Sequence, residues 1–175
     1  MTCSADLAKA RRQMTNVGIV ITSRSGVTDI LCSPQECAEV AYLISIGTAT
    51  DGPPEGFQNV ENRLRLEFED VLEGESGPSA QDVAKLVRFA HRVDPSRGSV
   101  VVHCQGGISR STAAAAIVLA VLLGPGHEGY AFDEVFRQRP QALPNGRMLE
   151  LADTMLDNRG ALAREAKRWS RPTRS

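Results

Sequence analysis

The chain has 175 residues and a formal net charge of −1, with 20 basic residues against 21 acidic ones, and 42% of its residues are hydrophobic. The charge argues against general binding to nucleic acid or another polyanion, and the length suits a single domain over residues 1–175 with its own core. The longest apolar run, residues 113–123, is too short to span a membrane, and residues 1–14 lack the apolar region of a secretory signal, so we expect a cytoplasmic protein.

The first part of the chain predicts short strands separated by turns. Residues 1–15 are polar and predict a frayed or helical arm. The strands predicted from alternating or β-branched apolar residues cover 17–21, 27–32, 42–46 and 64–68. Ser33-Pro34-Gln35-Glu36 has the pattern of a capping box with proline at the first helical position, and predicts a short helix.

A long segment rich in Gly, Pro and Asp separates two of these strands, at residues 47–62. Loops of this length are often functional. Its Phe57 has two interpretations, as the wall of a pocket or as part of a small core beneath the loop.

The second part predicts helices around one more strand. Ser79-Ala80-Gln81-Asp82 opens a helix with an apolar stripe, and a strand follows at 100–102. The later predicted helices cover 110–123, 130–139 and 146–158. The basic tail, 161–175, predicts a solvated helix and a loose end rather than a site for an anionic partner. Together these elements predict an α/β fold, with a mostly parallel central sheet of about four to five strands flanked by helices.

One stretch, from Val100 to Thr112, carries the chemistry. β-Branched residues lead into a glycine-containing loop and then an alanine-rich helix, so backbone N–H groups and the positive end of the helix dipole converge on one point. Cys104 opens this loop as a candidate nucleophile, and Arg110 closes it with a guanidinium suited to two phosphate oxygens. Ser111 offers a hydroxyl hydrogen bond to the sulfur. The candidate phosphate-binding residues are Gln105, Gly106, Gly107, Ile108, Ser109 and Arg110.

The run His103-Cys104, five residues, Arg110-Ser111 resembles the signature of the cysteine-dependent protein tyrosine phosphatase superfamily, and of its compact dual-specificity branch in particular. The segment 139–145 resembles the Arg-Pro…Pro-Asn element that follows the signature helix in that branch. The resemblance covers roughly residues 40 to 157. It implies that His103 orients the loop and lowers the pKa of Cys104; the alternatives are a satisfied buried histidine, and a buried cysteine with a capping arginine.

A phosphate ester also needs a carboxylic acid to protonate the leaving oxygen. In the similar family this is an aspartate on a loop upstream of the signature, and Asp70 stands at the matching place, with Glu69, Glu73 and Glu75 as rivals. Gln141 and Asn145 are candidates for positioning water or bracing the loop, or are ordinary turn residues.

These residues predict an enzyme that hydrolyses phosphomonoesters through a phosphocysteine, without cofactor or metal, as a tyrosine or dual-specificity protein phosphatase. Its expected partners are a phosphorylated protein or a small phosphoester, and a phosphate or sulfate ion in the site. The alternatives are a non-catalytic module that binds phosphate or phosphoproteins, a phosphatase of a non-protein ester, and a sulfurtransferase. The absence of further Lys or Arg within the loop weighs against highly phosphorylated inositol lipids. Cys32 and Cys37 are either small buried residues or redox partners of Cys104.

Overall fold

The computed structural model describes residues 18–170, in which a four-stranded, wholly parallel sheet has the order β1-β4-β2-β3. The strands are β1 (Ile19–Thr22), β2 (Val40–Gly47), β3 (Asn62–Glu67) and β4 (Ser99–His103). The α-helices are α2 (Arg24–Cys32), α3 (Pro34–Ala38), α4 (Ala80–Ala90), α5 (Arg110–Leu123), α6 (Glu128–Gln138), α7 (Gly146–Leu156) and α8 (Ala161–Trp169). The predicted α/β class is confirmed, with four strands. The expected arm at 1–15 and residues 171–175 of the tail lie outside the described residues.

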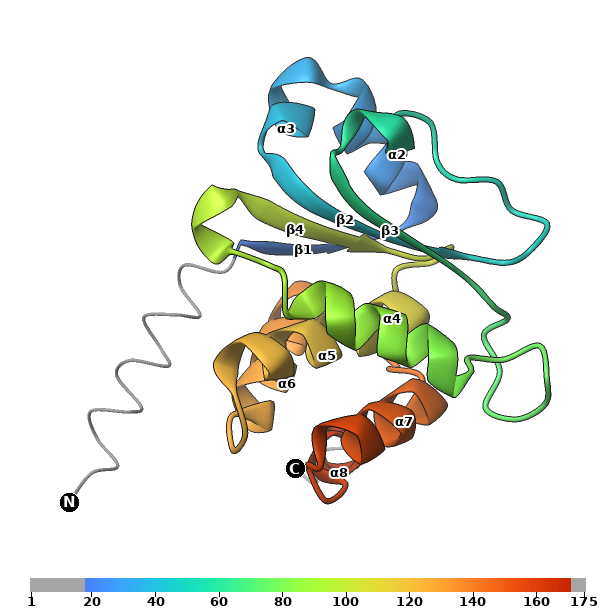
Figure 1. The fold of residues 1–175 in the computed structure, drawn as a ribbon, viewed down its shortest axis with the longest axis vertical. Coiled ribbons are helices and arrows are strands. Elements are labelled where there is room, and N and C mark those ends of the chain that lie inside the picture. Colours follow the sequence, from blue (N-terminus) through green and yellow to red (C-terminus); the bar gives the residue numbers. More distant parts are fainter. Residues whose placement is uncertain (1–17, 171–175) are drawn as a thin grey trace.

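The sheet separates two layers of helices (Figure 1). α2 and α3 cover one face, and α4 to α8 cover the other. Side chains alternate along each strand, so Leu43 and Val101 enter the smaller core beneath α2, whereas Ile44 and Val102 enter the larger core with α5. Both faces of the two central strands are therefore buried, as expected for a parallel sheet.

The predicted strand at 27–32 is wrong, because these residues form the second half of α2. Ser23 caps this helix, and its Oγ accepts a hydrogen bond from the N–H of Gly26 at 3.3 Å. Val27 and Leu31, four residues apart, supply the buried stripe. The apolar residues in this short segment thus follow helical spacing, which explains why the sheet has four strands.

The predicted helix starts agree with the structure, except that α6 begins at Glu128 and not at residue 130. Ser33 caps α3, and Ser79 and Asp82 form a reciprocal capping box at α4. α5 is buried along almost its whole length and ends before Gly124. Phe57 packs at the smaller core under the 47–62 loop, with the Arg63 guanidinium over its ring, so the second interpretation of this residue is confirmed.

The outer strand β1 is held at its free edge by the end of α6. The Gln138 side chain accepts a hydrogen bond from the N–H of Ile21 at 3.0 Å and donates one to the carbonyl of Ile19 at 2.7 Å. The Arg139 Nε donates to the Ile21 carbonyl at 2.9 Å. None of the helices in residues 18–170 is long and apolar enough to cross a membrane.

Candidate active site

The stretch singled out in the sequence folds as strand, loop and helix at the carboxyl end of the central strand β4. His103 ends β4, and Arg110 begins α5. The backbone N–H groups of Gly107, Ile108 and Ser111 donate hydrogen bonds to the Cys104 sulfur, and the Ser111 Oγ lies 3.2 Å from it. The backbone N–H groups of the loop therefore converge on the predicted nucleophile, as expected from the sequence.

Gly107 is required by this loop conformation. Its φ is +71°, a left-handed backbone that strains other residues, and an added Cβ would lie 2.9 Å from the carbonyl carbon and oxygen of Thr22. The loop is thus pressed against the end of β1, and the N–H of Arg24 also donates to the Gln105 carbonyl at 3.2 Å.

The environment of Cys104 favours the thiolate. Burial alone raises the pKa of the Cys104 thiol, but the Ser111 hydroxyl and the loop N–H groups donate hydrogen bonds that outweigh burial, so the pKa lies below its usual value. The side chain is only 2% exposed, yet it lines the open cavity described below. A buried but accessible sulfur anion is the form that can attack a phosphate ester.

Arg110 lines the same cavity as this sulfur and keeps donor groups free for a ligand. Its Nη1 donates to the Phe68 carbonyl at 2.9 Å, which anchors the guanidinium. Its Nε is buried and has no hydrogen-bond partner within residues 18–170. An unpaired buried donor is costly unless a ligand satisfies it, and an oxyanion above the loop would do so.

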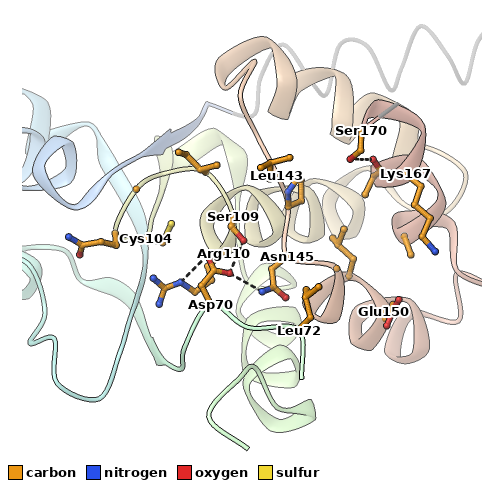
Figure 2. A pocket seen from close by; sticks show the side chains of 18 residues that line it. Asp70, Leu72, Cys104, Ser109, Arg110, Leu143, Asn145, Glu150, Lys167 and Ser170 are labelled. Atoms are coloured by element: carbon orange, nitrogen blue, oxygen red, sulfur yellow. Dashed lines mark hydrogen bonds and ion pairs between the residues drawn. The ribbon is translucent and has the colours of Figure 1, made fainter. Parts of the chain in front are cut away.

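Asp70 is the carboxylate that the structure brings to the loop (Figure 2). Its Oδ1 accepts hydrogen bonds from the Ser109 Oγ at 2.7 Å and the Asn145 Nδ2 at 2.9 Å, and its Oδ2 lies 3.9 Å from the Arg110 Nε. The rivals Glu69, Glu73 and Glu75 are exposed and do not line the cavity. The geometry therefore favours Asp70 as the candidate acid.

His103 is buried and neutral rather than cationic. Its ring is 1% exposed, and burial lowers its pKa to about 4. Its Nδ1 lies 3.3 Å from the Cys104 carbonyl oxygen, and its Nε2 lies 2.7 Å from the Ser45 Oγ. His103 is thus a satisfied buried histidine in contact with the loop, and any influence on Cys104 comes from positioning rather than positive charge.

The buried His103 predicts a loss of stability in mild acid. The unfolded histidine, with a pKa of 6.5, binds a proton as the pH falls toward 4, whereas His103 in the folded protein stays neutral. The free energy of unfolding should therefore decrease between these two pH values, by about 3 kcal/mol in total. Urea unfolding across this range should give a flatter pH dependence for His103→Asn than for the wild type. The exposed His91→Asn is the control, and an unchanged pH dependence in His103→Asn would contradict the expectation.

The 139–145 segment braces both the phosphate loop and the Asp70 loop. The N–H of Leu143 donates to the Ile108 carbonyl at 3.0 Å, and the N–H of Asn145 donates to that of Ser109 at 3.3 Å. The Asn145 side chain caps α7 and also donates to Asp70 and to the Val71 carbonyl. Asn145 is therefore a brace, whereas Gln141 is exposed and does not line the cavity.

The cavity above the loop, about 660 Å³ in volume, continues well beyond the space that a phosphate group needs. Leu72, Ile108 and Leu143 stand exposed along its walls. In Figure 2, Cys104 lies at one end of this cavity, and Glu150 and Lys167 lie at the other. Sequence reasoning missed Leu72, Glu150 and Lys167, because they come from separate segments that no local motif connects, and it singled out the 139–145 segment without assigning Leu143 to a cavity wall.

The expectation of a solvated helix in the tail needs correction for α8. Leu162 and Ala166 are buried, and Trp169 stacks on Phe136 with ring centroids 4.8 Å apart. The carboxylate of Asp153 accepts hydrogen bonds from the N–H groups at the start of α8. Residues 162, 166 and 169 follow helical spacing, a signal that predicts a packed stripe.

Cys32 is exposed and Cys37 is partly buried, so the interpretation as small buried residues is wrong for Cys32. Neither residue lies near the site. They are on the α2 and α3 side of the sheet, beside the strand ends opposite to the phosphate loop. Since β4 rises about 3.3 Å per residue over its length, about 15 Å separates the two ends. A disulfide joins Cα atoms within about 7 Å, so neither residue pairs with Cys104 in this fold.

No protein-family model matches the sequence, and no curated protein matches it. Its fold is similar to solved phosphatase structures at low identity. Human DUSP28 matches with a TM-score of 0.62 and 19% identity over 82% of this chain and 94% of that one. DUSP15 matches with a TM-score of 0.61 and 21% identity over 86% of this chain and 91% of that one. PTPMT1 in complex with PI(5)P matches with a TM-score of 0.53 and 20% identity over 83% of this chain and 86% of that one.

These likenesses extend over most of both chains. At these identities the likenesses establish a shared fold. The chain therefore has the fold of the compact, dual-specificity-like branch of the cysteine-dependent protein tyrosine phosphatase superfamily.

Proposed function

We propose that this protein is a cysteine-dependent phosphatase that hydrolyses phosphomonoesters in proteins, as a tyrosine or dual-specificity phosphatase. The observation that carries the proposal is the meeting of two groups in one cavity. A sulfur whose thiolate is stabilised by loop N–H groups lies beside an arginine whose buried Nε lacks a partner within residues 18–170. One group supplies a nucleophile, and the other supplies a vacant donor for the phosphate oxygens.

In the first step, the Cys104 thiolate attacks phosphorus while the bond from phosphorus to the leaving oxygen breaks. The loop N–H groups and Arg110 hold the other oxygens of the transferring group, and Asp70 donates its proton to the leaving oxygen. The products are a phosphocysteine and the free alcohol or phenol.

In the second step, a water molecule attacks phosphorus and passes its proton to the Asp70 carboxylate. The sulfur–phosphorus bond breaks, and its electron pair returns to Cys104. The Ser111 hydroxyl, 3.2 Å from the sulfur, donates a hydrogen bond to the departing thiolate. The cycle regenerates the ionised sulfur and the protonated Asp70 without a metal or cofactor. A reducing compartment such as the cytoplasm suits this thiol.

A panel of phosphoesters tests the proposal. The full chain is incubated with phosphotyrosine, phosphoserine and phosphothreonine peptides and with phosphoinositides, with a Cys104→Ser sample as the blank. Phosphate release from the peptides supports the proposal. Binding of the peptides without release by the wild type would favour an interaction module, and thiocyanate formation from thiosulfate and cyanide would indicate a sulfurtransferase.

A non-protein phosphoester is the second candidate. A fold neighbour, PTPMT1, was solved in complex with PI(5)P, and the cavity here has exposed apolar walls. Release from phosphoinositides alone would favour this candidate. Arg110 is the only cation among loop residues 105–110, which favours an ester carrying few phosphates.

The apolar wall of the cavity predicts a specificity effect. Leu143 is 65% exposed, and a substrate extending from the phosphate toward α8 would cover it. Leu143→Ser should therefore raise the KM for a phosphotyrosine peptide about three- to tenfold, with little change in kcat. Met155→Ser is the matched control, because Met155 is also exposed but lies outside the cavity. An equal effect of the two substitutions would argue against contact between Leu143 and substrate.

A further inference from the structure

Three polar side chains form a row across the sheet and end at the nucleophile. Arg65 on β3, Ser45 on β2 and His103 on β4 are register partners on adjacent strands. The Arg65 Nη1 lies 2.9 Å from the Ser45 Oγ, which lies 2.7 Å from the His103 Nε2. The His103 Nδ1 in turn lies 3.3 Å from the Cys104 carbonyl oxygen. Arg65 and Ser45 have no part in the mechanism above.

The chemistry of these groups gives the row a direction. A guanidinium only donates, so Ser45 accepts from Arg65, and its single hydroxyl hydrogen is left for the His103 Nε2. The neutral ring then carries its hydrogen on Nδ1, where it donates to the Cys104 carbonyl. Ser45 and His103 are both buried, so water does not compete for these hydrogen bonds.

Arg65 is held in the orientation that this row requires. Its guanidinium also donates to the Asp51 carbonyl and pairs with the Glu67 carboxylate at 3.3 Å. It lies against Gly47, where an added Cβ would come within 2.8 Å of the Arg65 Nη1. A glycine at the end of β2 therefore leaves the space in which Arg65 reaches Ser45.

We propose that Arg65 and Ser45 are positioning residues that fix the hydrogen of His103 on Nδ1 and thereby hold the Cys104 backbone at the start of the phosphate loop. The inference deepens the proposed function and rests on Cys104 being its nucleophile. With the hydrogen on Nε2, the Nδ1 lone pair would face the Cys104 carbonyl oxygen. The two would repel, and the loop N–H groups that stabilise the thiolate would shift away from the sulfur.

The charges around His103 make its neutral form part of this arrangement. The guanidiniums of Arg24, Arg65 and Arg110 all disfavour a proton on the ring, in addition to burial. The row thus acts through one fixed tautomer and not through a change of charge near neutral pH.

Two measurements on the full chain test the inference without requiring turnover. Nitrogen NMR of labelled histidine reports which ring nitrogen of His103 carries the hydrogen. The rate of Cys104 alkylation by iodoacetamide as a function of pH reports the thiolate fraction. The variants are Ser45→Ala and Arg65→Met, with Gly47→Ala to displace Arg65 indirectly. Arg63→Met is the matched control, since Arg63 lies on the same strand and donates to the Val60 carbonyl outside the row.

We expect an Nδ1-protonated His103 in the wild type and in Arg63→Met. In Ser45→Ala and Arg65→Met, part or all of the signal should move to the Nε2-protonated form, and alkylation below neutral pH should slow about five- to tenfold. If Ser45→Ala does not fold, Arg65→Met on the edge strand β3 and Gly47→Ala at the end of β2 carry the same test. An Nε2-protonated ring in the wild type, or alkylation in Arg65→Met as fast as in Arg63→Met, would overturn the inference. If the proposed function is wrong, the protein will not hydrolyse phosphoesters, but the His103 tautomer and the Cys104 alkylation rate will still change in the variants as expected.

Discussion

Replacement of Cys104 by serine is expected to lower phosphate release from 4-nitrophenyl phosphate about 10⁴-fold or more, because a serine hydroxyl stays protonated where the thiol ionises. The loop N–H groups and Arg110 remain in this variant, so binding of inorganic phosphate should persist. Phosphate release measures the first effect, and the rise in Tm with added phosphate measures the second.

Cys37→Ser is the control for this experiment, since Cys37 lies at the opposite end of the sheet and should leave both readings unchanged. Substantial turnover by Cys104→Ser would remove the nucleophile assignment. Loss of turnover together with loss of phosphate binding would point to a collapsed loop instead, and Cys104→Ala would then separate the two causes.

Asp70→Asn should lower kcat in proportion to how much the leaving oxygen needs a proton. For a phosphoserine peptide or another alkyl phosphate we expect a loss of about 10²- to 10⁴-fold, the usual contribution of a positioned acid. For 4-nitrophenyl phosphate, whose phenoxide leaves without assistance, the loss should be much smaller. The ratio of the two kcat values is the measurement. The same substitution also tests the second step, in which Asp70 acts as a base, because an Asn side chain cannot accept the proton of the attacking water.

Glu73→Gln removes a carboxylate from the same loop and is the matched control, because Glu73 is exposed and outside the cavity. An equal loss for alkyl and nitrophenyl esters in Asp70→Asn would reassign the acid. The rivals Glu69 and Glu75 on the same loop would then be tested by the same pair of esters, since Glu150 lines the far end of the cavity from Cys104.

The sequence predicted the centre of the molecule well, because the relevant signals are local there. The run from Val100 to Ser111 places strand, loop and helix in consecutive residues, and the structure confirms each of them. Asp70 follows a strand, but the choice of this residue as the candidate acid depends on the resemblance to the phosphatase family and not on a local pattern alone. The capped starts of α3 and α4 follow from side chains three residues apart.

The remaining features depend on contacts that a local pattern does not contain. The short apolar run at residues 27–32 of α2 fits either the strand or the helix period, and only its packing on the sheet selects the helix. In the sequence, Ser45 is 20 residues from Arg65 and 58 residues from His103. Their alignment therefore comes from strand register alone. Lys167 reaches the cavity only because α8 packs beside α7, which itself carries Glu150.

The position of Cys32 and Cys37 has a consequence for oxidative damage. A peroxide that converts Cys104 to a sulfenic acid meets no second sulfur within the described residues that is close enough to condense with it. Cys32 and Cys37 therefore cannot restore the Cys104 thiol through a disulfide, whereas the cavity has room for a small external thiol such as glutathione to reach the oxidised sulfur.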